Sequence, residues 1–229
     1  MRFTLAGLFA LGFMAFSFAQ PKDTSPTADE RKAIELVMKA GGKAEIDPKL
    51  SESARVSAKF ESATDGVLMN LKKAPQIGAL DVFDATRCTE KGLAALKELP
   101  YLQRLIFGKS EMTVARAKAI AECKELRKLY LASSGLTDTA LEELAKLTLL
   151  ESLDISDNAR VSDKGMASVK MLERLQALYL GKTNLTDKGL QELKNLDGLR
   201  SLNVVGTKVT GDAADKFADE MPNLRTVRR

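Results

Sequence analysis

The chain has 229 residues, 45% of them hydrophobic and 29% charged, which is enough apolar material for one sizeable core. Its formal net charge is only +4, and Lys and Arg are spread among Asp and Glu, so the sequence shows no basic field of the kind that binds nucleic acids. Histidine is absent, which removes the usual general base, the Ser-His-Asp and Cys-His nucleophile pairs and the commonest zinc ligand. These features argue against most hydrolase mechanisms.

Residues 1–19 have the features of a secretory signal peptide. Arg2 precedes an apolar run, and Ser17 and Ala19 occupy the minus-three and minus-one positions of a cleavage site before Gln20. An uncleaved membrane anchor is the alternative, because the length of this run lies at the lower limit for a membrane span. Residues 20–27 are polar and contain proline, and we expect them to form a linker. The sequence therefore predicts an exported protein, periplasmic or extracellular.

Ordered structure is expected from residue 28. Thr27 and Glu30 have the spacing of a capping box, and Ile34, Val37 and Met38 fall on one face of a helix that should end at the following glycine pair. Short alternating stretches around residues 43–47 and 56–60 then read as strands. We assign 28–53 to a helix that caps the first open end of a repeat array and to the segment that leads into that array.

Residues 54–229 contain an internal repeat. The stretch LTDTALEEL at 136–144 returns as LTDKGLQEL at 185–193, with a degenerate copy at 161–169. One hydroxyl residue recurs every 24 or 25 positions, as Thr64, Thr89, Thr113, Thr137, Ser162, Thr186 and Thr210. A sustained period of this length predicts a solenoid, in which stacked units share one core.

Each unit is predicted to contain one strand and one helix. Its first part follows the pattern L-x-x-L-x-L, with apolar residues alternating as on a strand with one buried face, from Ile77 in the first regular strand to Val227 in the last. The hydroxyl residue then serves as a helix N-cap, and the aspartate after it favours the positive end of the helix dipole. From Thr186, Leu190 and Leu193 recur at helical spacing, while Lys188 points outward.

The columns LxxLxLxxTxLTDxGLxxLxxL, as in residues 175–196, resemble leucine-rich repeat proteins, specifically a helix-containing class found in exported bacterial proteins and in F-box adaptors. The resemblance implies an α/β fold: a right-handed horseshoe with a parallel sheet on the concave face, helices on the convex face and a protein partner in the concavity. No F-box segment precedes the array, which argues against an adaptor role. The asparagine of many such repeats is replaced by Ala85, Ser110, Ser134, Thr183 and Thr207, and is kept only as Asn158.

Neither metal nor cofactor binding is expected. Thr137, Asp138, Thr186 and Asp187 could be read as paired ligand sites, but helix capping explains them. An acidic cluster around residues 154–163 suggests a calcium loop at first sight. Its members, Asp154, Asp157, Asn158 and Asp163, lack the spacing that a calcium loop requires.

Candidate binding residues lie between the buried positions of each strand, where side chains face the open concave surface. This central column reads Asp81, Ile106, Tyr130, Asp154, Tyr179 and Asn203, with Arg104 and Lys128 just before it and Phe83, Ser156 and Val205 just after. Two of the three tyrosines of the chain flank an aspartate there, and tyrosine is enriched in binding hot spots. The alternative is that exposed strands simply favour aromatic residues. We expect the partner-binding residues to be Arg104, Ile106, Lys128, Tyr130, Asp154, Tyr179 and Asn203.

Of three functions that remain open, we expect the first, a non-catalytic, exported module that binds another protein on its concave face. The second is an enzyme or an inhibitor-like protein, although an enzyme is opposed by the lack of histidine and of a clustered nucleophile and base. The third is a structural component of the cell envelope.

The two cysteines are predicted to be free thiols. Cys88 occupies a buried column just before a helix, and Cys123 occupies another at the helix end. These columns lie about 15 Å apart along the helix, whereas a disulfide needs Cα atoms within about 7 Å.

Overall fold

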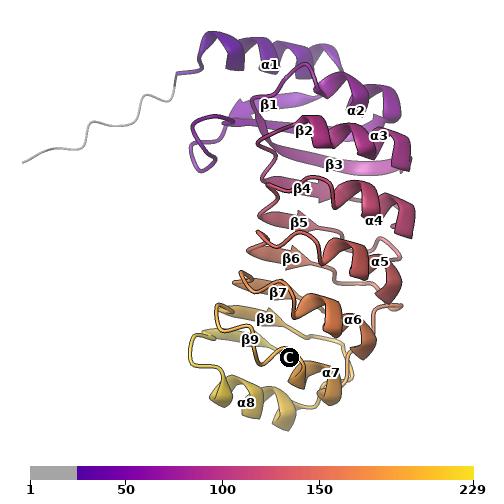
Figure 1. The fold of residues 1–229 in the computed structure, drawn as a ribbon, viewed down its shortest axis with the longest axis vertical. Coiled ribbons are helices and arrows are strands. Elements are labelled where there is room, and N and C mark those ends of the chain that lie inside the picture. The colour runs from indigo at the N-terminus through magenta and orange to yellow at the C-terminus, as the bar shows by residue number, and fades with distance from the viewer. Residues whose placement is uncertain (1–24) are drawn as a thin grey trace, which may run out of the picture.

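A computed structural model describes residues 25–229 as one curved array (Figure 1). The predicted signal peptide and most of the predicted linker lie outside the described residues. No helix within 25–229 is long and apolar enough to cross a bilayer. The elements are α1 (Ala28–Lys39), β1 (Lys43–Ile46), β2 (Val56–Thr64), α2 (Asp65–Leu71), β3 (Ile77–Arg87), α3 (Glu90–Ala94), the 3₁₀ helix η1 (Ala95–Glu98), β4 (Arg104–Phe107), α4 (Val114–Ile120), β5 (Lys128–Tyr130), α5 (Asp138–Leu144), β6 (Ser152–Asp154), α6 (Asp163–Val169), β7 (Ala177–Tyr179), α7 (Asp187–Gln191), β8 (Ser201–Asn203), α8 (Gly211–Glu220) and β9 (Thr226–Arg228).

The strands form a single sheet in sequence order, β1 to β9. The pair β1–β2 is antiparallel, and every later pair is parallel. Helices α2 to α7 line the side opposite the strands and follow the outer curve of the array, whereas α1 and α8 lie at its two ends (Figure 1). The predicted solenoid, with a parallel sheet on the inner face and helices on the outer face, is confirmed.

The core runs the whole length of the array because each unit contributes the same buried columns. The leucines of the strand pattern and of the helix are almost fully buried, and Phe60, Phe107 and Phe217 fill the larger gaps near the first units and the last helix. One unit could not bury these side chains alone, so the stacking of neighbours supplies the stabilising burial. This continuous core fixes the direction of every strand and therefore the face that its alternate residues present.

The helix in front of the array is confirmed as a cap, with one correction. Thr27 and Glu30 make the predicted capping box, and Arg55 at the start of the array holds the Glu30 carboxylate at 2.9 Å. This hydrogen bond from Arg55 holds the pKa of Glu30 below its usual value. The expectation that Met38 lies on the buried face was wrong. The helix packs through the face that carries Glu30 and Val37. Met38 follows Val37 and is rotated by about 100° around the helix axis, so its side chain is 63% exposed.

The hydroxyl residue that recurs in each repeat caps its helix as predicted, except at Thr64, whose side chain makes no capping hydrogen bond. The other six hydroxyls each accept a backbone N–H from the first turn of their helix. The helices themselves are short, since most end after five to seven residues and continue as turns. A short helix makes few internal hydrogen bonds, so its N-cap forms a large share of its local stabilisation.

Four of the recurring hydroxyl residues are followed by an aspartate that links one repeat to the next, which the sequence did not predict. Asp163 accepts two hydrogen bonds from Thr186 of the next repeat, 2.8 Å from its N–H and 2.6 Å from its hydroxyl. A Cβ atom at position 189 would lie 2.2 Å from Asp163 Oδ1, which explains the glycine of the T-D-x-G segment. The same pairing joins Asp65 to Thr89, Asp138 to Ser162 and Asp187 to Thr210.

Replacing Thr186 by alanine should therefore lower the free energy of unfolding by about 1 to 2 kcal/mol, because it removes both the helix cap and the hydroxyl bond to Asp163. Chemical denaturation measures the change. Lys188→Ala, on the exposed face of the same helix, is the matched control and should stay within about 0.5 kcal/mol of wild type. Equal denaturation midpoints for the two variants would contradict the capping assignment.

Hydroxyl groups replace most of the missing asparagines. Thr183 and Thr207 each donate a hydrogen bond to the carbonyl three residues earlier, and Ser134 does the same at 2.8 Å. Asn158 is the exception, because it is fully buried and bridges two repeats through its amide. Hydroxyl groups therefore occupy three of the positions that asparagine holds in many such repeats.

Cys88 and Cys123 are both buried and free, as predicted. Burial raises the pKa of Cys88 to about 11 and that of Cys123 to about 12, so neither thiol forms a reactive thiolate at neutral pH. We expect iodoacetamide to leave the native protein unlabelled and to add two labels once the protein is denatured without reductant. Denatured protein that takes a label only after reduction would overturn the assignment.

Candidate partner-binding surface

The predicted binding column forms a continuous row across the inner face. Strand register places Ile106, Tyr130, Asp154, Tyr179 and Asn203 directly beside one another on β4 to β8. Neighbouring strands lie about 4.8 Å apart, so the row extends over roughly 20 Å. All five side chains are partly exposed. The sequence thus predicted both the residues that share the column and their exposure.

Small residues border the two tyrosines. Most positions that lie two residues before or after Tyr130, Asp154 and Tyr179 in the chain hold small residues. These are Ala132, Ser152, Ser156, Ala177 and Gly181. Both tyrosine side chains are partly exposed and can therefore contact a partner. The tyrosines also carry hydroxyl groups that can exchange hydrogen bonds with a partner.

Asp154 and Asn203 each use one side-chain oxygen locally. Asp154 Oδ1 accepts the N–H of Ser156 at 2.9 Å, and Asn203 Oδ1 accepts that of Val205 at 3.0 Å. These bonds hold both side chains in fixed orientations at the ends of their strands. A partner would therefore meet preoriented polar groups between and beside the tyrosines.

Apolar side chains extend the surface at two places. Phe83 in β3 is 45% exposed, and Val205 just after β8 is 44% exposed. Both follow the central column by two positions and so share its face. The exposed inner face therefore combines aromatic, aliphatic and polar groups, as protein interfaces do.

Asp81 does not belong to the open surface, which corrects the expectation for the first member of the column. It is only 4% exposed because Arg104 covers it, with Nε and Nη2 at 3.2 and 3.3 Å from its two carboxylate oxygens. Arg104 also contacts Asp47 at 3.3 Å and the Ser57 hydroxyl at 3.0 Å. Arg104 therefore holds the lead-in segment against the array, whereas Lys128 beside it on β5 is exposed.

The residues of the suspected calcium loop have separate structural roles. Asp157 forms an ion pair with Lys182 at 3.0 Å, Asp163 belongs to the link between repeats, and Asn158 is buried in the core. Within residues 25–229, no three His, Cys, Asp or Glu side chains are grouped so as to hold a metal ion.

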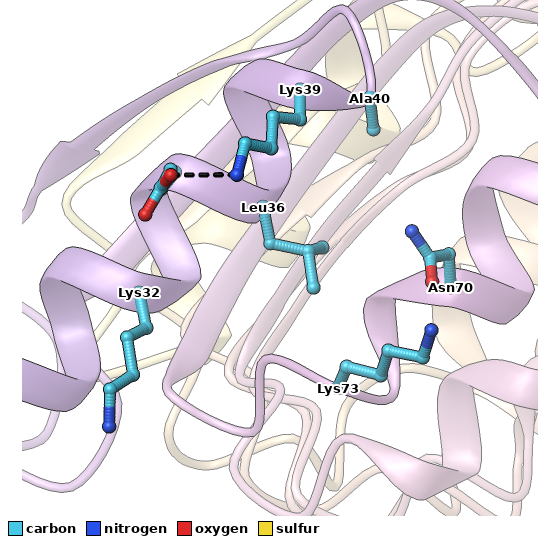
Figure 2. Close-up of a pocket in the computed structure, with 7 residues that line it drawn as sticks. Lys32, Leu36, Lys39, Ala40, Asn70 and Lys73 are labelled. Atoms are coloured by element: carbon cyan, nitrogen blue, oxygen red, sulfur yellow. Dashed lines mark ion pairs between the residues drawn. The ribbon is translucent and has the colours of Figure 1, made fainter.

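A separate hollow of about 320 Å³ lies between α1 and α2 at the first end of the array (Figure 2). Leu36 points into it, with Lys32 and Lys39 on one side and Asn70 and Lys73 on the other (Figure 2). Its one carboxylate, Glu35, is held by Lys39 at 2.7 Å. Its lining provides cationic groups and an amide, but neither a nucleophile with a base nor a pair of carboxylates.

Comparisons with known proteins agree with this architecture. A family model for the leucine-rich repeat matches residues 146–169. The chain therefore contains a leucine-rich repeat and has the fold of leucine-rich repeat proteins. Internalin C2 from Listeria monocytogenes str. 4b F2365 superposes with a TM-score of 0.57 at 19% identity, over 75% of this chain and 78% of internalin C2. TLR13 in its complex with ssRNA13 gives 0.53 at 21%, over 68% of this chain and 22% of TLR13. No curated protein sequence matches the chain.

Sequence reasoning missed the loop between β1 and β2, which borders the inner face of this leucine-rich repeat array. Asp47 in this loop reaches Arg104, and Ser51 accepts a hydrogen bond from Gln103 at 2.8 Å. These partners lie more than fifty residues later in the sequence. The loop has no repeat pattern, so no periodic signal could have placed it there.

Proposed function

We propose that this chain is an exported, non-catalytic module that binds another protein on the inner face of its leucine-rich repeat array. The observation that carries the proposal is the row of Tyr130, Asp154 and Tyr179 on adjacent strands, partly exposed and bordered by small residues. Binding energy in protein interfaces is concentrated in a few central residues, among which tyrosine is enriched. The middle of the row is the place where such a centre is expected.

The architecture supports the proposal in energetic terms. The inner face is built on a rigid sheet whose strands are fixed by the buried columns beneath them. A partner that binds a preformed surface loses little free energy to ordering the protein. The lack of histidine and the buried, unreactive thiols support a non-catalytic role.

Site-specific photo-crosslinking provides the test. A benzophenone amino acid in place of Tyr130 should crosslink to one specific protein in cells, and the same amino acid in place of Lys188 on the outer face should not. Mass spectrometry of the crosslinked product identifies the partner. Crosslinks to that partner from position 188 but not from position 130 would assign binding to the outer face.

Export is tested separately by the N-terminus of the mature protein. If the signal peptide is cleaved after Ala19, we expect the mature chain to begin at Gln20 and to be recovered outside the cytoplasm. An intact N-terminus in a membrane fraction would instead support the anchor.

A further inference from the structure

The inner face carries an unbalanced positive charge beside its tyrosines. Arg104 and Lys128 are register partners on β4 and β5, but Arg104 is already neutralised by Asp81 and Asp47. Within residues 25–229, Lys128 has no acidic group at ion-pair distance, and its side chain is exposed. Lys128 is therefore available to an external anion.

Lys128 also lines a hollow of about 160 Å³ between the β1–β2 loop and the starts of the repeat strands. The acidic groups in this hollow are already used, because Asp47 contacts Arg104 at 3.3 Å and Glu151 contacts Arg127 at 2.5 Å. Lys49 also lines this hollow, and within residues 25–229 it has no acidic group at ion-pair distance. The hollow thus offers two ammonium groups without an acidic partner, and a carboxylate of a binding partner would complement them.

Hydrogen bonds hold the wall of this hollow in place. Asp47 Oδ1 accepts the N–H of Lys49 at 3.0 Å, and its own N–H donates to the Arg55 carbonyl at 2.8 Å. The Gln103 amide on the repeat side donates to Ser51 at 2.8 Å. Because the loop is tied to itself and to the array, the backbone that carries Lys49 is held in place beside the strand of Lys128 before a partner arrives.

Tyr130 lies on the same strand as Lys128, which lines the hollow. It follows Lys128 by two residues on β5, which places the two Cα atoms about 7 Å apart on the same face. Ile106 lies beside Tyr130 on β4. An anionic group bound at Lys128 would therefore stand next to an aromatic and aliphatic surface.

The geometry points to a partner segment that is acidic, with an aromatic or aliphatic residue next to its carboxylates. Its carboxylate enters the hollow between Lys49 and Lys128, and its apolar neighbour packs on Tyr130 and Ile106. This inference rests on the proposed function, since it names the kind of partner that the inner face accepts. An extended segment of about seven residues spans the roughly 24 Å from β3 to β8.

Selection from a displayed library of random peptides of about a dozen residues tests this inference on the full folded chain. We expect selected peptides to be enriched in Asp and Glu next to aromatic or aliphatic residues. Lys128→Glu should weaken their binding at least about tenfold, and rising salt should weaken binding to the wild type. Lys188→Glu makes the same charge change on the outer face and should alter binding less than about twofold.

The outcomes separate this inference from the proposed function. Three results would overturn the inference. The selected peptides could show no acidic excess, acidic peptides could bind Lys128→Glu as tightly as wild type, or the selection could yield no peptide. If neutral peptides still lose affinity when Tyr130, Asp154 and Tyr179 are replaced by alanine, the inner face remains the binding face and only the acidic partner is wrong. Peptides unaffected by that triple replacement would count against the proposed function itself.

Discussion

Replacement of Asn158 by alanine is expected to lower the free energy of unfolding by roughly 2–6 kcal/mol. The Asn158 amide oxygen accepts the N–H groups of Ser134 and Leu136 at 3.0 and 2.9 Å, and its nitrogen donates to the carbonyls of Leu131 and Ile155 at 3.0 and 2.9 Å. Alanine leaves the two N–H groups buried without a partner, at about 1–3 kcal/mol each. Chemical denaturation monitored by circular dichroism measures the loss.

Two further variants isolate the cause. Asn184→Ala removes an exposed amide that donates one hydrogen bond, to the Ala159 carbonyl, and should cost no more than about 1 kcal/mol. Asn158→Asp keeps the acceptor but places a charge beside two carbonyl oxygens. Its deficit should shrink as pH falls, because a buried carboxyl has a raised pKa and donates a hydrogen bond once protonated. A stability for Asn158→Ala equal to that of Asn184→Ala would refute the bridging role.

Replacing Tyr130, Asp154 and Tyr179 together by alanine should weaken capture of the crosslinked partner by more than about 2 kcal/mol, which is roughly thirtyfold. The three residues lie on adjacent strands and form a compact patch near the middle of the array. They lie outside the fully buried core, so the folded state and its helical content should be nearly unchanged. Titration of the identified partner against wild-type and variant proteins measures the effect.

A matched triple variant tests the other face. Lys188, Gln191 and Lys194 lie on and just after α7, and the ion pair of Lys194 with Glu220 at 2.6 Å is an exposed one that contributes little. Replacing all three by alanine should leave partner binding unchanged. If the outer variant loses binding and the inner variant retains it, the binding face has been assigned to the wrong side of the array.

The candidate surface was predictable from sequence wherever it follows the repeat. Tyr130, Asp154 and Tyr179 occupy one column because each lies between two buried leucine-pattern positions, and alternation along a strand then fixes their face. The same reasoning placed Asp81 on the open surface and was wrong there. The arginine that covers Asp81 belongs to the next strand, and a second carboxylate, Asp47, draws it toward the lead-in segment.

The sequence by itself determined the solenoid, its strand and helix columns, the capping hydroxyls and the two buried thiols. The positions that carry these features recur every 24 or 25 residues. The spacing of apolar residues within each repeat indicates whether a segment is a strand or a helix and which of its faces is buried. Only the tertiary structure decided that Asp163 bonds the next repeat, that Asn158 joins two turns, and that the β1–β2 loop forms a hollow beside Lys128. Those contacts join groups that lie from about twenty to more than fifty residues apart, and their partners are set by the stacking of units and the path of a non-repetitive loop.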